Sequence, residues 1–129
     1  MRENDGAKRR RAQSLGRLAE SQCVATLREA GWSILARRFR CGRGVEAGEI
    51  DLIARQGHLI AFIEVKARDS LEAALAAVSP RQRARIAQSA DVFLQGQPEL
   101  AACDCRFDVM VLLPGCPPHH VADAWRVGD

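Results

Sequence analysis

The sequence predicts an α/β domain in which helices cover both faces of a mixed β-sheet, and two observations support this. Segments 48–55 and 59–68 are rich in Ile, Leu, Val and Phe, and the turn signal Gln56-Gly57 separates them. This pattern is typical of a buried β-hairpin. Segments in which apolar residues recur at helical spacing lie before and after the hairpin. The order of elements therefore indicates a sandwich with the hairpin at its centre.

The remaining elements follow from periodicity and from end signals. Gly31 is placed to end the first helix, and Ser79-Pro80 resembles an N-cap followed by a proline at the first helical position. We expect a helix over 14–30, a strand over 32–41, the hairpin, helical stretches over 71–78 and 80–94, a strand over 106–113 and a short final element.

The positive charge of the chain is concentrated at its beginning. The net charge is +3, and the residues before position 12 account for all of it, so the rest of the chain is neutral. We expect residues 1–12 to be a basic, disordered tail, with residues 13–129 forming a single domain. Alternatively, the block Lys8-Arg9-Arg10-Arg11 is an arm that contacts phosphates.

Composition narrows the class of protein. Hydrophobic residues make up 47% and charged residues 27% of the 129 positions, as in ordinary globular proteins, and no apolar run is long enough to span a membrane. The five cysteines contain no C-x-x-C pair, so reduced thiols are expected rather than a zinc site or disulfides. We therefore expect a cytoplasmic protein without a membrane partner.

Two charged residues interrupt the second strand of the hairpin. Glu64 and Lys66 are two positions apart, so their side chains project from the same face. A carboxylate surrounded by Ile, Phe and Val is costly to desolvate unless another group compensates it. A bound cation is the natural candidate.

The register of the hairpin brings further carboxylates to this face. If Gln56-Gly57 forms a two-residue loop, Asp51 lies opposite Phe62. Glu49 then lies opposite Glu64, although a three-residue loop or a bulge would change the pairing. Neighbouring carboxylates repel each other, and a divalent ion removes that conflict. Mg²⁺ takes one or two carboxylates and keeps waters and phosphate oxygens as its other ligands.

Composition also singles out Lys66. The chain contains seventeen Arg and only two Lys, and the other lysine, Lys8, lies in the N-terminal segment. Lysine is a compact point charge on a flexible stem, whereas arginine presents a planar fork. A lysine at this interior position is therefore suited to hold a water molecule or a phosphoryl oxygen.

These residues carry a resemblance to a known family. Asp51, twelve residues, and then Glu64-Val65-Lys66 match the signature of PD-(D/E)xK nucleases, with Ile50 where the name has Pro. The longer strings at 48–54 and 62–68 resemble the YraN-type family of uncharacterised bacterial proteins, which is similar in its core to archaeal Holliday-junction resolvases. The resemblance covers roughly residues 14–127.

The resemblance implies a restriction endonuclease-like α/β/α sandwich with a central mixed sheet. It implies that Asp51 and Glu64 bind Mg²⁺ or Mn²⁺, with the Val65 carbonyl as a further ligand. Glu20 on the first helix is a candidate extra ligand, although most helix glutamates carry only surface charge. Glu20 and Glu49 would together complete a second metal position, or they would lie just outside the position that Asp51 and Glu64 hold.

Arginines near the hairpin are candidates for holding a nucleic-acid backbone. Alternatively, they are solvated side chains that guard a sheet edge. Family members often have Lys where this chain has Gln, at position 82. The nucleic-acid-binding candidates are Arg37, Arg38, Arg40, Arg43, Arg81, Gln82 and Arg85.

Some charged residues outside the hairpin have weaker assignments. Arg106 and Asp108 either support the site from a neighbouring strand or buffer a sheet edge. The three histidines, His58, His119 and His120, have no carboxylate partner in their sequence context, and we expect them at the surface.

The leading hypothesis is a metal-dependent endonuclease that hydrolyses DNA phosphodiester bonds, with branched DNA among its substrates. The catalytic candidates are Asp51, Glu64 and Lys66. The alternative is a non-catalytic or partner-dependent protein that binds nucleic acid on the same fold, DNA more readily than RNA. A symmetric homodimer would pool two arginine patches, but the sequence leaves the oligomeric state open.

Overall fold

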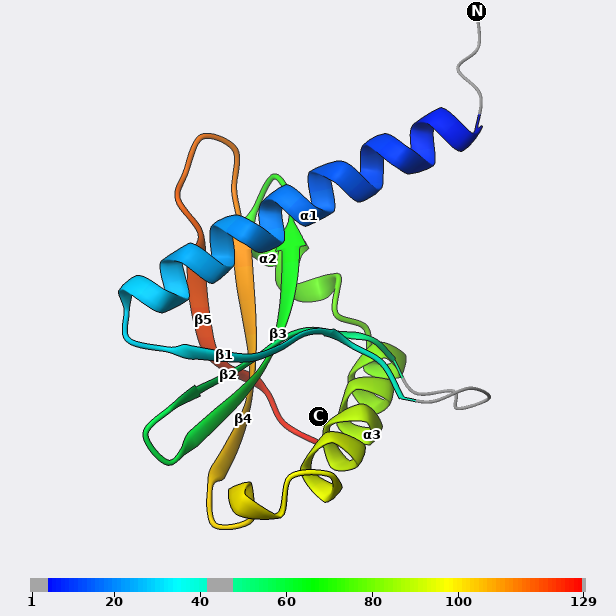
Figure 1. The fold of residues 1–129 in the computed structure, drawn as a ribbon. Coiled ribbons are helices and arrows are strands. Elements are labelled where there is room, and N and C mark those ends of the chain that lie inside the picture. Colours follow the sequence, from blue (N-terminus) through cyan, green and yellow to red (C-terminus); the bar gives the residue numbers. More distant parts are fainter. Residues whose placement is uncertain (1–4, 42–47, 129) are drawn as a thin grey trace, which may run out of the picture.

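The computed structural model describes residues 5–41 and 48–128, which form a five-stranded sheet and its covering helices (Figure 1). The elements are α1 (Asp5–Glu29), β1 (Ser33–Phe39), β2 (Ile50–Gln56), β3 (Leu59–Ala67), α2 (Leu71–Ala76), α3 (Pro80–Gln95), a 3₁₀ turn (Pro98–Leu100), β4 (Asp104–Leu112) and β5 (His119–Trp125).

The sheet confirms the predicted mixed α/β architecture. Its strand order is β1-β2-β3-β4-β5, with β3 and β4 parallel and the other neighbours antiparallel. Helix α1 lies across one face, and α2 and α3 lie on the other (Figure 1). This arrangement is consistent with the expected restriction endonuclease-like sandwich, and it puts the β2–β3 hairpin inside the sheet.

Successive side chains of the hairpin point to opposite faces of the sheet and contribute to two hydrophobic cores. Ile53 and Phe62 pair across the strands and face α2 and α3, where Ile86 and Phe93 pack on them. The intervening residues face α1 and pack on its Cys23, Val24 and Leu27. Because both faces of the hairpin are covered, its sequence is apolar at nearly every position.

Helix α1 ends as predicted but begins earlier. Gly31 has a φ of 92°, its amide donates to the Arg28 carbonyl, and the Trp32 amide donates to the Leu27 carbonyl. These two bonds form a Schellman motif, which requires a residue that tolerates the left-handed region. The helix starts at Asp5 rather than near Ser14, so residues 5–12 of the expected tail are helical, because no helix-breaking residue separates them from the apolar part.

The apolar pattern at the start of α1 does not reflect burial. Leu15 and Leu18 are 67% and 59% exposed, whereas Cys23 and Leu27 are buried. Only the second half of the helix covers the sheet (Figure 1). None of the described helices combines the length and the apolarity needed to cross a bilayer.

The register predicted for the hairpin was wrong by two residues. Gln56 pairs with Leu59, so the loop is Gly57-His58 rather than Gln56-Gly57. Gly57 has a φ of 60°, as the first loop residue of a type II′ turn requires. Because the period of a strand is two residues, each side chain keeps the predicted face but has a different partner. Asp51 therefore aligns with Glu64 rather than with Phe62.

The start of α3 follows its predicted signals. Ser79 is the N-cap, its hydroxyl accepts a hydrogen bond from the Gln82 amide at 3.2 Å, and Pro80 is the first helical residue. The preceding α2 is short, and Ser70 caps it in the same way. The N-terminal end of α3 lies beside the end of the hairpin that carries Glu64, because Gln82 contacts that carboxylate.

A buried polar cluster joins β4 to β5. Asp108 is fully buried, accepts two 2.8 Å bonds from the Arg106 guanidinium and one from the Asp123 amide, and lies 2.6 Å from His120 Nε2. The prediction that His120 is an unpartnered surface residue was therefore wrong, because pairing of β4 with β5 brings together residues that are distant in sequence. Arg106 and His120 also pack on the Trp32 ring.

Candidate metal centre

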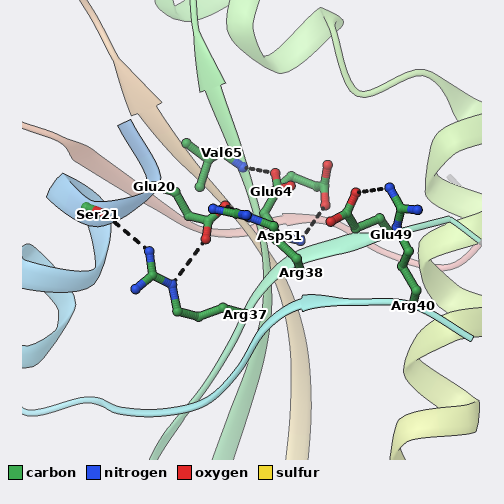
Figure 2. A network of polar contacts seen from close by, with 9 residues as sticks. All are labelled: Glu20, Ser21, Arg37, Arg38, Arg40, Glu49, Asp51, Glu64 and Val65. Carbon is green, nitrogen blue, oxygen red and sulfur yellow. Dashed lines mark hydrogen bonds and ion pairs between the residues drawn. The ribbon is translucent and has the colours of Figure 1, made fainter. Parts of the chain in front are cut away.

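The candidate site lies where β2 and β3 separate. Leu52 and Ile63 form the last regular pair of the hairpin, and beyond it carboxylates take the place of backbone partners. The Asp51 amide donates to Glu64 Oε1 at 3.3 Å, and the Val65 amide donates to Asp51 Oδ2 at 2.8 Å. Figure 2 shows the two carboxylates side by side at this fork. Two acidic side chains thus hold the ends of the splayed strands.

Burial makes the charged state of both carboxylates unfavourable. It is the main cause that raises the pKa of Glu64 to about 8, and the negative charge of Asp51 adds to it. Burial also raises the pKa of Asp51, although the Val65 amide and Lys66 oppose this. The groups around the pair therefore compensate its negative charge only in part.

Two clefts meet at this fork. The first, about 570 Å³, opens toward α1, and the second, about 470 Å³, opens toward α3. Glu49, Asp51 and Val65 line both clefts. Glu64 is almost wholly buried and lines only the second. The two clefts are therefore adjacent to each other at the carboxylate pair.

The second cleft contains the predicted lysine and glutamine. Lys66 lies beside both carboxylates, and its charge favours their ionised forms. Gln82 donates from Nε2 to Glu64 Oε2 at 3.0 Å, so it orients this carboxylate. Arg81 and Arg85 of α3 line the same cleft.

The first cleft contains a carboxylate that two arginines hold. Glu20 is buried, and its Oε1 and Oε2 accept 3.1 Å bonds from Arg37 Nε and Arg38 Nε. Arg40 pairs in turn with Glu49 at 3.2 Å (Figure 2). Arg43, another predicted contact for nucleic acid, lies outside the described residues.

The donor set fits a hard divalent ion at the fork. The described residues contain no group of three His, Cys, Asp or Glu side chains that could hold a metal ion. Asp51 and Glu64 nevertheless provide two adjacent, under-compensated carboxylates. A hard ion such as Mg²⁺ needs only one or two carboxylates, with a backbone carbonyl, waters and phosphate oxygens as its other ligands. The Val65 carbonyl belongs to the strand between the clefts.

Some residues at the site were not predicted. Arg17 and Arg68 line the first cleft, and Ser79 lines the second. Arg68 lies two residues after Lys66, just beyond the end of β3, so its place near the fork could be predicted from the sequence. Arg17 was not foreseeable, because its position depends on how α1 crosses the sheet.

A buried serine fixes the chain just before the fork. The Ser89 hydroxyl of α3 donates to the Gly48 carbonyl and accepts a 3.5 Å bond from the Cys41 thiol. The Gly48 amide donates to the Arg85 carbonyl at 3.3 Å. These contacts hold the chain against α3 three residues before Asp51.

Replacing Gly48 with alanine should destabilise the protein by about 1–2 kcal/mol, as overpacking does. A Cβ at this position would lie 3.0 Å from the Arg85 Cβ, which is too close for a carbon contact. Gly16→Ala is the matched control, because a Cβ there meets nothing within 4 Å. It should stabilise helix α1 by about 0.5–1 kcal/mol. Urea unfolding of both variants measures the two changes, and equal effects would contradict the close contact.

Burial of Glu64 predicts a specific pH dependence of stability. Because the folded-state pKa is raised from 4.5 to about 8, the folded protein binds this proton more tightly than the unfolded chain. Without divalent ions, its stability relative to Glu64→Gln should therefore fall as the pH rises from about 5 to 8.5. Over this pH interval, a shift of this size corresponds to a loss on the order of 4 kcal/mol. Urea unfolding in EDTA at both pH values measures the difference, and a constant difference would be the contrary result.

Comparison with known proteins identifies relatives over most of the chain. A family model described as "Uncharacterised protein family UPF0102" matches residues 19–112. The chain is 47% identical over 116 residues to UPF0102 protein amb4503 of Paramagnetospirillum magneticum, covering 90% of each protein. It is 42% identical over 120 residues to the UPF0102 protein of Methylocella silvestris, covering 93% of this chain and 94% of the relative. For the UPF0102 protein of Acidiphilium cryptum, the identity is 41% over 127 residues, covering 98% of this chain and 95% of the relative.

Proposed function

Since the chain belongs to the uncharacterised protein family UPF0102, whose name assigns no activity, we propose from its site that it is a metal-dependent nuclease that hydrolyses DNA phosphodiester bonds. The observation that supports this most strongly is the adjacent pair of the half-buried Asp51 and the buried Glu64 at the open end of the hairpin. Two adjacent carboxylates that are largely removed from water reduce stability unless a bound cation compensates their charge.

A divalent ion is the ligand that this pair fits best. Asp51, Glu64 and the Val65 carbonyl would hold Mg²⁺ or Mn²⁺. When bound, such an ion supplies polarisation of the phosphate and a lowered pKa of a coordinated water. The hydrogen bond from Gln82 keeps the Glu64 carboxylate oriented toward the fork.

Lys66 has a separate role. It lines the second cleft beside both carboxylates, where its ammonium can hold the attacking water or offset negative charge on the phosphate. A protein that only binds a metal ion would not need a third charged group at this point. The lysine therefore favours hydrolysis over binding alone.

The arginines around the clefts support a polyanionic substrate. The side chains of Arg17, Arg38, Arg40 and Arg68 line the first cleft, and those of Arg81 and Arg85 line the second. Guanidinium groups recognise phosphates through bidentate hydrogen bonds. A nucleic-acid backbone that crosses the fork would meet arginines on both sides. We include branched DNA among the substrates because the hairpin strings resemble a family that is similar in its core to archaeal Holliday-junction resolvases.

The second candidate function is a protein that binds nucleic acid without cleaving it alone. Two observations favour it: the described residues contain no group of three potential metal-ligating side chains, and the chain beyond its N-terminal segment is neutral. A regulated nuclease that needs a partner would share both features. Cleavage assays separate these functions.

The test is incubation of the purified protein with linear and four-way-junction DNA in the presence of Mn²⁺, Mg²⁺ or EDTA. The proposal predicts cleavage that requires the divalent ion and that falls at least about 100-fold in Lys66→Ala, as when a catalytic group is removed. Asp69→Asn, an exposed change just beyond β3, is the control and should cleave normally. Binding of DNA without cleavage under any of these conditions would support the second candidate.

A further inference from the structure

Two neighbouring arginines on β1 hold the same buried carboxylate, which a regular strand does not allow. Successive side chains of a strand point to opposite faces. Arg37 and Arg38 nevertheless both donate to Glu20, each from Nε at 3.1 Å (Figure 2). The backbone explains this, because Arg38 has a φ of 52°, in the left-handed region that residues with a side chain rarely adopt. The chain therefore accepts local strain to bring Arg38 to Glu20.

We propose that Glu20 is a positioning residue that holds Arg38 as a phosphate-binding group of the first cleft, and that Glu20 is not a metal ligand. This inference rests on the proposed function for the identity of the substrate. It differs from what the family resemblance implies for Glu20, which is a role as an extra ligand.

The contacts of Glu20 argue against a role in metal binding. Each of its oxygens already accepts a hydrogen bond from a guanidinium group, and its side chain is only 7% exposed. A metal ion bound to Glu20 would lie beside these two guanidinium charges, which repel it and already compensate the carboxylate. Glu64 differs, because among the described residues its oxygens accept hydrogen bonds only from the uncharged Asp51 amide and the Gln82 side chain.

The free end of Arg38 argues for anion binding. Its Nε bonds to Glu20, and within residues 5–41 and 48–128 its terminal nitrogens make no hydrogen bond. The side chain is 38% exposed and lines the first cleft together with Asp51 and Arg68. A guanidinium fixed at one edge leaves its remaining donors in a set direction, which suits a phosphate oxygen. Figure 2 shows this group between Glu20 and the carboxylates of the fork.

The first measurement separates a positioning role from a ligand role. Calorimetric titration with Mn²⁺ alone should give the same affinity, within about twofold, for wild type and Glu20→Gln. Asp51→Asn should lose binding in the same experiment. A tenfold weaker affinity in Glu20→Gln would overturn the inference and leave the proposed function intact. Full binding by Asp51→Asn would instead contradict the proposed function.

The second measurement tests Arg38 without any metal. Fluorescence anisotropy with a labelled single-stranded DNA of twelve nucleotides, in EDTA, should show binding about tenfold weaker in Arg38→Ala, as for the loss of one charge-assisted contact. The slope of the logarithm of the binding constant against the logarithm of the salt concentration should become less steep by about 0.7. Arg38→Lys, which keeps the charge but not the fork, should also bind more weakly than wild type.

A double mutant and a matched arginine complete the test. In the Glu20→Gln background, the effect of Arg38→Ala should shrink to less than about threefold, because the guanidinium is no longer held in position. Arg28→Ala removes an exposed arginine from the far end of α1 and should change binding by less than about twofold. Equal losses in Arg28→Ala and Arg38→Ala, or an undiminished effect of Arg38→Ala without Glu20, would overturn the proposal.

Discussion

Replacing Asp51 with asparagine is expected to abolish metal-dependent cleavage and, at the same time, to stabilise the protein. Cleavage should fall at least about 1,000-fold. The asparagine amide is a poorer ligand for a hard cation than the carboxylate, and the substitution removes one negative charge from the site. Stability without metal should rise by about 1 kcal/mol, a typical gain when a functional site is relaxed.

The gain in stability follows from the surroundings of this carboxylate. Burial raises the pKa of Asp51, so its ionised form is unfavourable in the folded state, and Glu64 lies beside it. An asparagine keeps an oxygen that can accept the hydrogen bond from the Val65 amide, without the negative charge.

The measurement combines urea unfolding in EDTA with a cleavage assay in Mn²⁺. Asp69→Asn is the control, because that carboxylate is exposed and should change neither quantity. Loss of both activity and stability in Asp51→Asn would indicate that the main role of the carboxylate is to stabilise the fork rather than to bind a metal ion.

Replacing Asp108 with asparagine is expected to cause the largest loss of stability among the substitutions considered. The loss should be about 3–5 kcal/mol, as when one partner is removed from a buried ion pair. It corresponds to a fall in melting temperature of roughly 10–15 °C for a domain of this size. The amide nitrogen would face the Arg106 guanidinium or the His120 ring, so that donors would meet donors.

The pH dependence of this effect has a definite sign. Burial alone would raise the pKa of Asp108, but hydrogen bonds from His120, Arg106 and the Asp123 amide outweigh it and lower the pKa. The ionised form therefore contributes stability above the ordinary pKa of about 4, and that contribution is lost as the pH falls through the folded-state pKa.

Urea unfolding of wild type and Asp108→Asn at pH 7 and pH 3 checks both the size and the sign. The difference between the two proteins should shrink in acid. Asp104→Asn, an exposed carboxylate on the same strand, should unfold like wild type at both pH values. A loss at pH 7 as small as that of Asp104→Asn would contradict the structural role of Asp108.

The hairpin could be predicted from the sequence because its strands and turn depend on residues that are close together in the chain. An apolar run interrupted by Glu64 and Lys66 marks both the buried strand and the residues that cannot be there for packing alone. The predicted turn, Gln56-Gly57, lies one residue before the observed loop, Gly57-His58. A glycine at the first loop position is itself a signal for a type II′ turn, and it would have given the register seen in the structure.

The surroundings of the hairpin depend on contacts that no local pattern encodes. The two arginines on Glu20 require both the crossing of α1 over β1 and a left-handed residue at Arg38, which nothing in the residue type indicates. The contact between His120 and Asp108 likewise depends on the pairing of β4 with β5. In both cases, the partner is identified only after the sheet is assembled.

The proposed nuclease function depends on a divalent-ion site that Asp51 and Glu64 form together. Calorimetric titration of Mn²⁺ into wild type, Asp51→Asn and Glu64→Gln at pH 8 measures whether this site exists. We expect one site in the wild-type protein, with binding lost in both variants and protons released in the wild type because the Glu64 carboxyl must ionise. No binding at millimolar Mn²⁺, or equal binding in all three proteins, would contradict it.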